Sequence, residues 1–311
     1  DKTGTLTEGK PKVTEIMGEG DVLLLAAIAE KKSEHPLAEA ILNKAKEMGI
    51  SVDDPDKFNV IPGKGIEASY KGDQILFGNR KIMEEKKISF ASLENKIMQL
   101  EEEGKTVMLL AKNNLAEGII AAADTLKKYS KEAIRELRKS GIDVVMITGD
   151  NLRTGKAIAK QAGIDEVLAE VMPQEKAAKI KELQSKGKKV AMVGDGINDA
   201  PALAQANTGI AIGSGTDVAI ETGEIILVKD DLRDVVTAID LSAYSMRKIK
   251  QNLFWAFIYN IIGIPIAAGV LFPFTGFLLN PIIAGAAMAF SSVSVVTNSL
   301  LMRRFRPRKM L

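Results

Sequence analysis

The sequence opens with Asp-Lys-Thr-Gly-Thr-Leu-Thr, which places a carboxylate, a cation, hydroxyl groups and a glycine within seven residues. The Asp1 carboxylate can act as a covalent nucleophile toward a phosphoryl group, which divides hydrolysis into two easier steps. A nearby cation such as Lys2, together with N–H donors, can stabilise a loose phosphoryl-transfer transition state. An isolated Asp-Lys-Thr could equally be a polar surface turn. The whole heptapeptide predicts phosphoryl chemistry.

Three further features of the sequence carry side chains that suit a phosphate site. Asp195 and Asp199 lie four residues apart at an expected strand-to-helix turn, and Mg²⁺ usually takes one or two carboxylates together with water and phosphate oxygens. Thr148-Gly-Asp150 offers a hydroxyl group and backbone N–H groups, and Lys176 offers a cation on the first turn of a helix. Taken alone, the turn could be structural and the lysine could belong to a solvated helix face, so each gains weight from the others.

The elements that must position these residues alternate between strand-like and helical patterns. Strand-like runs at 143–148, 189–193 and 209–212 each end in a Gly/Asp or Gly-rich turn. Amphipathic segments at 131–140 and 174–186 lie between them. This alternation predicts a doubly wound parallel sheet with its site at the carboxyl ends of the strands.

Residues 13–123 follow another pattern, which predicts an α+β insert joined to the parallel domain near Pro11 and Asp124. Helical patterns come first and Gly-punctuated strands follow. The expected helices are 21–31 and 36–48, and the expected strands are 65–70, 74–77, 107–112 and 115–122.

Charge is distributed unevenly along the 311 residues. Lys and Arg number 42 and Asp and Glu number 40, yet residues 251–302 contain none of these four types and residues 303–309 carry five positive charges. This pattern excludes a general nucleic-acid binder and favours a soluble head attached to a membrane. Because there is no cysteine and only one histidine, His35, the chain cannot form disulfides, thiolate zinc sites or multi-histidine metal sites.

The charge-free stretch predicts two transmembrane helices, at 253–272 and 281–302, joined by a turn at 273–276. Each is long enough to cross roughly 30 Å of hydrocarbon. Basic residues flank both outer ends, so the positive-inside tendency places both ends in the cytoplasm. The polar first residues predict no signal peptide.

In their order and spacing, the first seven residues, Thr148-Gly-Asp150 and the motif from Gly194 to Pro201 resemble the phosphorylation-domain motifs of P-type ATPases. The resemblance covers essentially the whole chain and implies a haloacid-dehalogenase-like fold. It implies a phosphorylation domain at 1–12 and 124–245, a nucleotide-binding domain at 13–123 and a basic cytoplasmic tail at 303–311.

The resemblance also implies roles for particular residues. The catalytic set is Asp1, Lys2, Thr3, Thr148, Lys176 and Asn198. In it, Asp1 accepts the phosphoryl group, and Thr148, Lys176 and Asn198 hold its oxygens. The Mg²⁺ set is Asp1, Thr3 through its backbone carbonyl, Asp195, and Asp199 beside them.

The insert resembles the nucleotide-binding domain of the heavy-metal branch of that family. Ser33-Glu34-His35-Pro36 matches one motif, Gly63-Lys-Gly65 matches its glycine pair, and Gly78-Asn79 is a weaker third element. An imidazole beside Glu34 can stack on and hydrogen-bond an adenine, and glycines let the backbone approach the nucleotide. Outside the family, His-Pro would more often start a helix. The implied cofactors are ATP and Mg²⁺.

The membrane segments resemble the copper(I)-exporting subgroup. The first carries Asn252, Tyr259-Asn260 and Pro265, and the second carries Met288-x-x-Ser291-Ser292. The thioether of Met288 is a soft ligand that suits Cu(I), and Ser291 and Ser292 share its helix face. Tyr259, Asn260, Met288, Ser291 and Ser292 are therefore the expected ligands for Cu(I), and also for Ag(I). Ordinary packing between membrane helices is the alternative for either span, but the acids or lysine expected of zinc or calcium pumps are absent.

The resemblance implies parts that this sequence does not contain: an actuator domain, six further membrane helices, a Cys-Pro-Cys helix and the strand leading into Asp1. We therefore interpret the chain as the C-terminal portion of an integral membrane pump of a prokaryotic plasma membrane, with its soluble domains in the cytoplasm. Three alternatives stay open. These are a catalytically silent, membrane-anchored nucleotide-binding module, a soluble phosphatase of the same fold, and a pump for another heavy metal.

Overall fold

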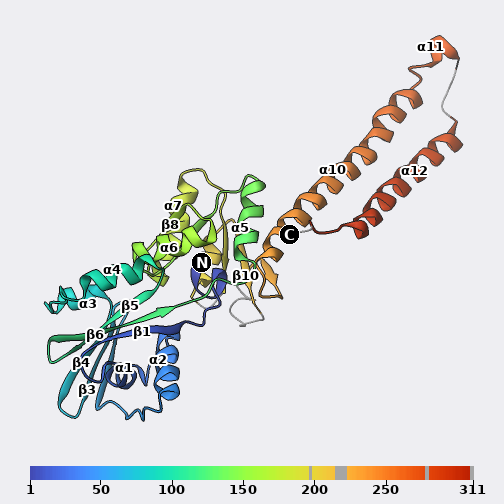
Figure 1. Cartoon of the computed structure of the whole chain (residues 1–311). Helices are drawn as coiled ribbons and strands as arrows, with labels where there is room; N and C mark the ends of the chain where they lie inside the picture. The colour runs from blue at the N-terminus through green and yellow to red at the C-terminus, as the bar shows by residue number, and fades with distance from the viewer. Residues whose placement is uncertain (196–197, 214–222, 277–279, 309–311) are drawn as a thin grey trace. The chain divides into compact units, whose positions relative to one another are not determined.

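The computed structural model describes residues 1–195, 198–213, 223–276 and 280–308, which divide into two compact units (Figure 1). The first unit is Asp1–Arg233 and the second is Asp234–Leu311. Within the predicted motifs and tail, residues 196, 197, 214, 215 and 309 lie outside the described residues.

A six-stranded antiparallel sheet lies within the segment expected to bind nucleotide. Its strand order is β1-β6-β5-β4-β3-β2. The strands are β1 Lys12–Gly18, β2 Lys57–Ile61, β3 Gly65–Tyr70, β4 Asp73–Gly78, β5 Thr106–Lys112 and β6 Leu115–Ala123. Each of the four expected strands of the insert matches an observed strand to within one residue at either end.

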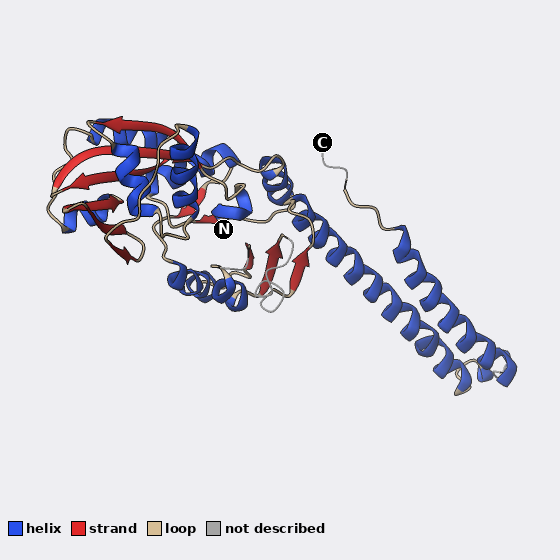
Figure 2. Ribbon diagram, turned by 90° about the horizontal axis from the view of Figure 1, so that it is seen from below, coloured by secondary structure: helices blue, strands red, loops and turns tan. Residues whose placement is uncertain are grey.

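Helices cover both faces of this sheet (Figure 2). Successive side chains of a strand point to opposite faces of the sheet, so each face offers apolar residues to a different pair of helices. In β4, Ile75 and Phe77 pack against the first pair of helices, and Leu76 packs against the second pair. The first pair is α1 Val22–Glu30 and α2 Pro36–Glu47, and the second is α3 Arg80–Glu85 and α4 Glu94–Glu102. The lobe therefore has two hydrophobic cores.

The rest of the first unit is built from parallel strands and helices, which confirms the expected α/β class. β9 Ala191–Gly194, β10 Thr208–Ile212 and β11 Ile225–Leu227 form one parallel sheet. β7 Val145–Ile147 and β8 Glu166–Leu168 form a second. The helices are α5 Ser130–Lys139, α6 Leu152–Ala162, α7 Lys176–Ser185 and α8 Ala200–Gln205, with a short 3₁₀ turn at Pro173–Glu175.

The parallel strands form two separate sheets instead of the single sheet that we expected. The two are nevertheless joined by packing, because Ile147 of β7 and Met192 of β9 belong to one core with Ile180 of α7 and Leu203 of α8. The backbone nitrogen of Asp1 donates to the carbonyl oxygen of Val193 at 2.7 Å. The first residue of the chain therefore lies against β9.

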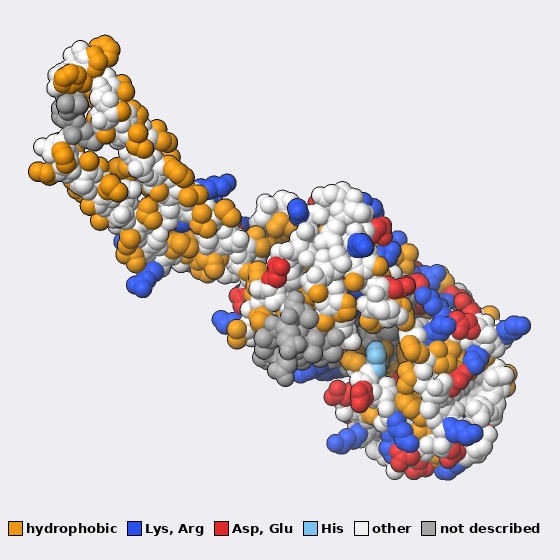
Figure 3. Space-filling view, turned by 180° about the vertical axis from the view of Figure 1, so that it is seen from behind, with side chains coloured by type: hydrophobic (Ala, Val, Ile, Leu, Met, Phe, Trp, Pro, Cys, Tyr) orange, Lys and Arg blue, Asp and Glu red, His pale blue; other side chains and the backbone are white. Residues whose placement is uncertain are grey.

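Helix α10 runs from Arg233, the last residue of the first unit, to Ala267. The second unit contains the rest of α10, together with α11 Phe272–Thr275, α12 Pro281–Leu300 and a 3₁₀ turn at Leu301–Arg304. Apolar side chains cover much of the surface of these helices (Figure 3). Among the described residues, one helical stretch, Pro281–Arg304, is long and apolar enough to cross a membrane.

The first expected span, 253–272, is only partly one helix. α10 contains Pro265, which lacks an N–H and disfavours helix continuation, and Gly269 has a left-handed φ of 86°. The helix therefore ends five residues before the predicted boundary, and the expected turn at 273–276 falls largely within α11. A second membrane span remains a prediction.

Candidate active site

The loop after Asp1 passes close to Asp195. Gly4 has a φ of 72°, and a Cβ at this position would lie 2.9 Å from Asp195 Oδ2. An L-residue with a side chain rarely adopts this φ. Glycine is therefore required here both by the backbone conformation and by the closeness of the Asp195 carboxylate.

Lys176 joins Asp1 to Asp199. Its Nζ donates to Asp1 Oδ1 at 2.8 Å and to Asp199 Oδ1 at 2.5 Å. The exposed fraction of the side chain is 7% for Lys176, 9% for Asp1 and 0% for Asp199. A buried charge is tolerated when it is paired and hydrogen-bonded, so this lysine belongs to the site and not to a solvated helix face.

Asp195 and Asp199 both lie near residue 1, close enough for their charges to act on it. Asp199 Oδ2 is buried and has no hydrogen-bond partner among the described residues. The carboxylates of Asp1, Asp195 and Asp199 are therefore gathered in one region.

These oxygens fit a Mg²⁺ ion that is bound together with a phosphate. The described residues contain no cluster of three or more His, Cys, Asp or Glu side chains that could hold a metal unaided. Mg²⁺ typically uses one or two carboxylates and completes its shell with water and substrate phosphates. Asp1 and Asp195 offer oxygens of this kind, with Asp199 beside them, while a role for the Thr3 carbonyl oxygen stays a prediction.

Lys2 and Thr148 both contact Asp150. Lys2 Nζ lies 2.7 Å from Asp150 Oδ2, and Thr148 Oγ1 donates to the same oxygen at 3.1 Å. Thr106 Oγ1 of the antiparallel lobe donates to Asp150 Oδ1 at 3.1 Å. Burial would raise the pKa of Asp150, but the charge and hydrogen bond of Lys2 and the two threonine hydroxyls lower it overall. In this structure Lys2 therefore neutralises Asp150, while Lys176 neutralises Asp1.

The Asn198 side chain is exposed, next to residues that the structure does not describe. Its expected role toward a phosphoryl group stays a prediction.

His35 forms the N-cap of α2. Its Nδ1 accepts a hydrogen bond from the Leu37 N–H at 3.2 Å, and Pro36 occupies the first helical position, where proline is favoured. Partial loss of hydration at the ring, followed by the charge of Lys2, lowers the pKa of His35, although the residue as a whole is exposed. The neutral ring therefore carries its proton on Nε2, which leaves this N–H and the ring face for a ligand, with the exposed Glu34 preceding it.

The predicted glycine pair is tied to Gly78-Asn79. Asn79 Nδ2 donates to the carbonyl oxygen of Gly63 at 2.8 Å. A Cβ on Gly65 would lie 2.3 Å from the carbonyl oxygen of Phe77. These two segments, which contain three glycines, therefore lie against each other in the antiparallel lobe.

Glu30 is a candidate that the sequence analysis missed. It is the last residue of the apolar helix α1, is 3% exposed, and its Oε2 has no hydrogen-bond partner among the described residues. Burial raises the pKa of Glu30, and a hydrogen bond from Ser33 only partly opposes this increase. The signal that could have revealed it is a carboxylate closing an otherwise apolar helix, five residues before His35.

The expected Cu(I) ligands do not form a contact network like the one that joins Asp1, Lys176 and Asp199. The Tyr259 hydroxyl lies 3.4 Å from Ser294 Oγ, whereas Asn260 donates to the Ala256 carbonyl oxygen of its own helix. Ser292 donates to the carbonyl oxygen of Met288, whose side chain is 70% exposed. A contact between α10 and α12 that was not predicted involves Asn252, which exchanges hydrogen bonds with Asn298 and Ser299 at 2.7 and 2.8 Å.

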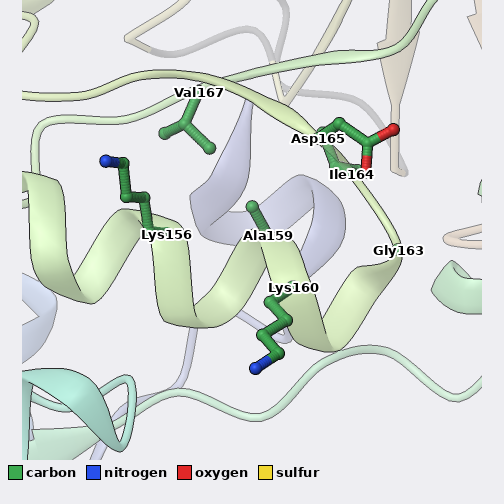
Figure 4. A pocket seen from close by; sticks show the side chains of 7 residues that line it. All are labelled: Lys156, Ala159, Lys160, Gly163, Ile164, Asp165 and Val167. Carbon is green, nitrogen blue, oxygen red and sulfur yellow. The ribbon is translucent and has the colours of Figure 1, made fainter.

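A cavity of about 300 Å³ at the end of α6 is a separate feature (Figure 4). It is lined by side chains that include Lys156, Lys160 and Asp165. None of the predicted site residues lines it, so it does not belong to the candidate active site.

The fold agrees with the comparisons. The family model of the haloacid dehalogenase-like hydrolases matches residues 1–207. The chain belongs to this family. Its relatives within it are P-type ATPases, which are ATP-hydrolysing transporters.

Three curated relatives illustrate the similarity. A probable copper-exporting P-type ATPase of Archaeoglobus fulgidus is 54% identical over 99% of this chain and 38% of its own length. A copper-exporting P-type ATPase of Staphylococcus aureus has the same identity and coverage. The probable copper-transporting ATPase PacS of Synechococcus elongatus is 52% identical over 99% of this chain and 42% of its own length. The chain thus spans about two fifths of these relatives.

Solved structures of ATPases are also similar to this chain. A zinc-transporting PIB-type ATPase in its E2.Pi state matches with a TM-score of 0.67 and 36% identity, covering 97% of this chain and 48% of that one. The catalytic domain of the CPx-ATPase CopB-B matches with a TM-score of 0.59 and 29% identity, covering 75% of this chain and 83% of that one.

Proposed function

We propose that this chain is part of an ATP-driven Cu(I) export pump and that it transfers the γ-phosphoryl group of ATP to Asp1. The observation that carries the proposal is the buried contact of Lys176 with both Asp1 and Asp199. A fixed cation next to a carboxylate nucleophile is what stabilises charge during phosphoryl transfer.

In the proposed reaction, one carboxylate oxygen of Asp1 forms a bond to the γ-phosphorus. The bond between this phosphorus and the β,γ-bridging oxygen breaks, and ADP leaves with the electron pair. Lys176, Thr148 and Asn198 hold the phosphoryl oxygens. Mg²⁺, held by Asp1, Asp195 and the Thr3 carbonyl oxygen with Asp199 beside them, would supply charge neutralisation.

We assign ATP binding to the antiparallel lobe, residues 13–123, and phosphorylation to 1–12 and 124–245. His35 offers its ring face and Nε2–H to the adenine, with Glu34 beside it, while Gly63 and Gly65 let the backbone approach the nucleotide. Glu30 adds a buried carboxylate oxygen without a partner among the described residues, which could accept a hydrogen bond from an exocyclic amine.

We assign Cu(I), and also Ag(I), to Tyr259, Asn260, Met288, Ser291 and Ser292. Support comes from the copper-exporting relatives and from the soft thioether of Met288. Spans at 253–272 and 281–302 and a basic tail at 303–311 place the head in the cytoplasm by the positive-inside tendency. The actuator domain and the Cys-Pro-Cys helix would be the partners of this chain in the whole pump.

The test is the Asp1→Asn variant of the pump that contains this chain, incubated with ATP labelled on its γ-phosphate. We expect no acid-stable phosphoprotein, while ATP binding, measured by calorimetry, is retained. Asp143→Asn is the matched control, because the Asp143 side chain is 83% exposed. Phosphorylation that survives Asp1→Asn would refute the proposal, and ATP binding without any phosphorylation of the unmodified pump would favour a silent nucleotide-binding module.

A zinc pump is the second candidate, because a zinc-transporting ATPase is a structural neighbour at 36% identity. Stimulation of ATP hydrolysis distinguishes the two: we expect stimulation by Cu(I) and none by Zn²⁺.

A further inference from the structure

The segment that follows the antiparallel sheet holds the far end of the catalytic loop. The Lys127 N–H donates to the Leu6 carbonyl oxygen at 3.0 Å, and Ser130 Oγ donates to the same oxygen at 2.7 Å. Thr7 Oγ1 donates to Asp124 Oδ2 at 2.6 Å. These contacts fix the backbone where the loop ends, but they do not reach Gly4.

The side chain of Lys127 does reach Gly4. Its Nζ donates to the Gly4 carbonyl oxygen at 2.5 Å and forms an ion pair with Asp230. Lys127 is 7% exposed, and a buried ammonium group is stable only when it is paired and hydrogen-bonded. The two contacts therefore satisfy a charge that would otherwise be costly to bury.

Gly4 lies between two charged groups. Its carbonyl oxygen contacts the Lys127 ammonium group, and its Cα hydrogen position faces Asp195 Oδ2, because a Cβ there would lie only 2.9 Å away. A change in the Gly4 peptide would therefore change the space available to the Asp195 carboxylate.

The Asp230 side chain is 56% exposed, and the residues that follow it make further contacts. Asp231 and Arg233 form an ion pair at 2.7 Å, and the Arg233 guanidinium lies 3.3 Å from the centre of the Tyr129 ring. Tyr129 is two residues after Lys127, and Arg233 is the first residue of α10. The segment from Lys127 to Tyr129 thus contacts both the catalytic loop and the residues that lead into α10.

We propose that Lys127 is a positioning residue for phosphoryl transfer: by joining the Gly4 carbonyl oxygen to Asp230, it keeps the catalytic loop in the conformation that places Asp195 beside Asp1. This inference rests on the proposed function, because it concerns the same reaction. It adds a residue that does not touch the phosphoryl group and an anion, Asp230, that anchors it.

The test compares Lys127→Met with Lys128→Met in the whole pump. Both remove one positive charge at neighbouring positions, but Lys128 is exposed. Lys127 and Lys128 both line a cavity of about 180 Å³, which gives a methionine at either position room to relax. Two further variants are Asp230→Asn, which removes the negative charge that pairs with Lys127, and Lys127→Arg, which keeps the positive charge at position 127.

The first readout is hydrogen–deuterium exchange of residues 2–6 without nucleotide or Mg²⁺. We expect about tenfold faster exchange in Lys127→Met, a smaller increase in Asp230→Asn and no change in Lys128→Met. Equal exchange in Lys127→Met and Lys128→Met would overturn the inference whether or not the pump is phosphorylated.

The second readout is the Mg²⁺ concentration that gives half-maximal phosphorylation of Asp1. We expect an increase of about tenfold in Lys127→Met, recovered in part by Lys127→Arg, with ATP affinity unchanged. A general loss of folding would instead lower ATP affinity and phosphorylation together at every Mg²⁺ concentration, and that result would overturn the positioning role. If the unmodified pump forms no phosphoprotein at all, the proposed function fails, and loop exchange still decides whether Lys127 holds Gly4.

Discussion

The candidate active site and the candidate metal site differ in how far their residues converge. Asp1, Lys176 and Asp199 are buried and in direct contact. Asn260 and Ser292 bond to carbonyl oxygens of their own helices, and Met288 is mostly exposed. The first site is thus assembled within one compact unit, whereas Asn260, Met288 and Ser292 of the second are not brought together by α10 and α12.

Ligand chemistry supports this comparison. Cu(I) prefers soft thiolate and thioether ligands, and the chain contains no cysteine. Changes near Asp1 should therefore alter chemistry within this chain, while changes at Asn252, Asn298 or Ser299 should alter mainly how α10 and α12 associate.

Gly4→Ala should have the largest effect. The left-handed φ of Gly4 disfavours alanine by about 1 kcal/mol, and the added Cβ must displace the Asp195 carboxylate, 2.9 Å away. We expect phosphorylation of Asp1 to become at least about tenfold slower, measured by rapid quench.

Gly187→Ala is the control for this variant. Gly187 has a φ of 79° and nothing within 4 Å of an added Cβ. It should lose similar stability and keep its phosphorylation rate. Equal rates in the two variants would mean that Asp195 is not needed where the structure places it.

Glu30→Gln should have a smaller effect, which depends on pH. Burial raises the pKa of Glu30 above 4.5 in the folded protein, so the folded state binds this proton more tightly than the unfolded state. The stability that Glu30 contributes is then complete below pH 4.5 and is lost as the pH rises through its folded pKa.

The glutamine variant cannot ionise, so we expect it to lose this pH dependence and to be about 1 kcal/mol more stable at pH 7. Urea unfolding at several pH values would measure this, with the exposed Glu39→Gln as control. A weaker affinity for ATP in the same variant would place Glu30 at the nucleotide, whereas an unchanged affinity would assign it to the core alone.

Asn252→Val should have the smallest effect. It removes hydrogen bonds between α10 and α12 at 2.7 and 2.8 Å, and such bonds contribute about 0.6 kcal/mol in membranes. We expect a small decrease in the midpoint of detergent unfolding. Asn260→Val is the control for helix association, because Asn260 bonds within its own helix; an equal decrease there would contradict the assignment.

Much of the fold was predictable because its signals are local. β3 has its expected bounds, Gly65–Tyr70, and α2 begins at Pro36 as expected. Alternation along the strands and a proline at a helix start do not depend on distant residues. Short elements such as β8 and β11, three residues each, carry too little pattern to be recognised.

The sequence alone predicted the chemistry that we propose for this protein: the expected carboxylate nucleophile, the expected Mg²⁺-binding aspartates and the charge-free segment follow from residue type and order. Only the tertiary structure decided which charges meet. Lys176 contacts Asp1 across 175 positions, and Lys127 contacts Gly4 across 123. It also directed Lys2 to Asp150 and used His35 Nδ1 as a helix cap. Such partners follow from how the strands and helices pack, because spacing along the chain does not specify which buried cation will neutralise which carboxylate.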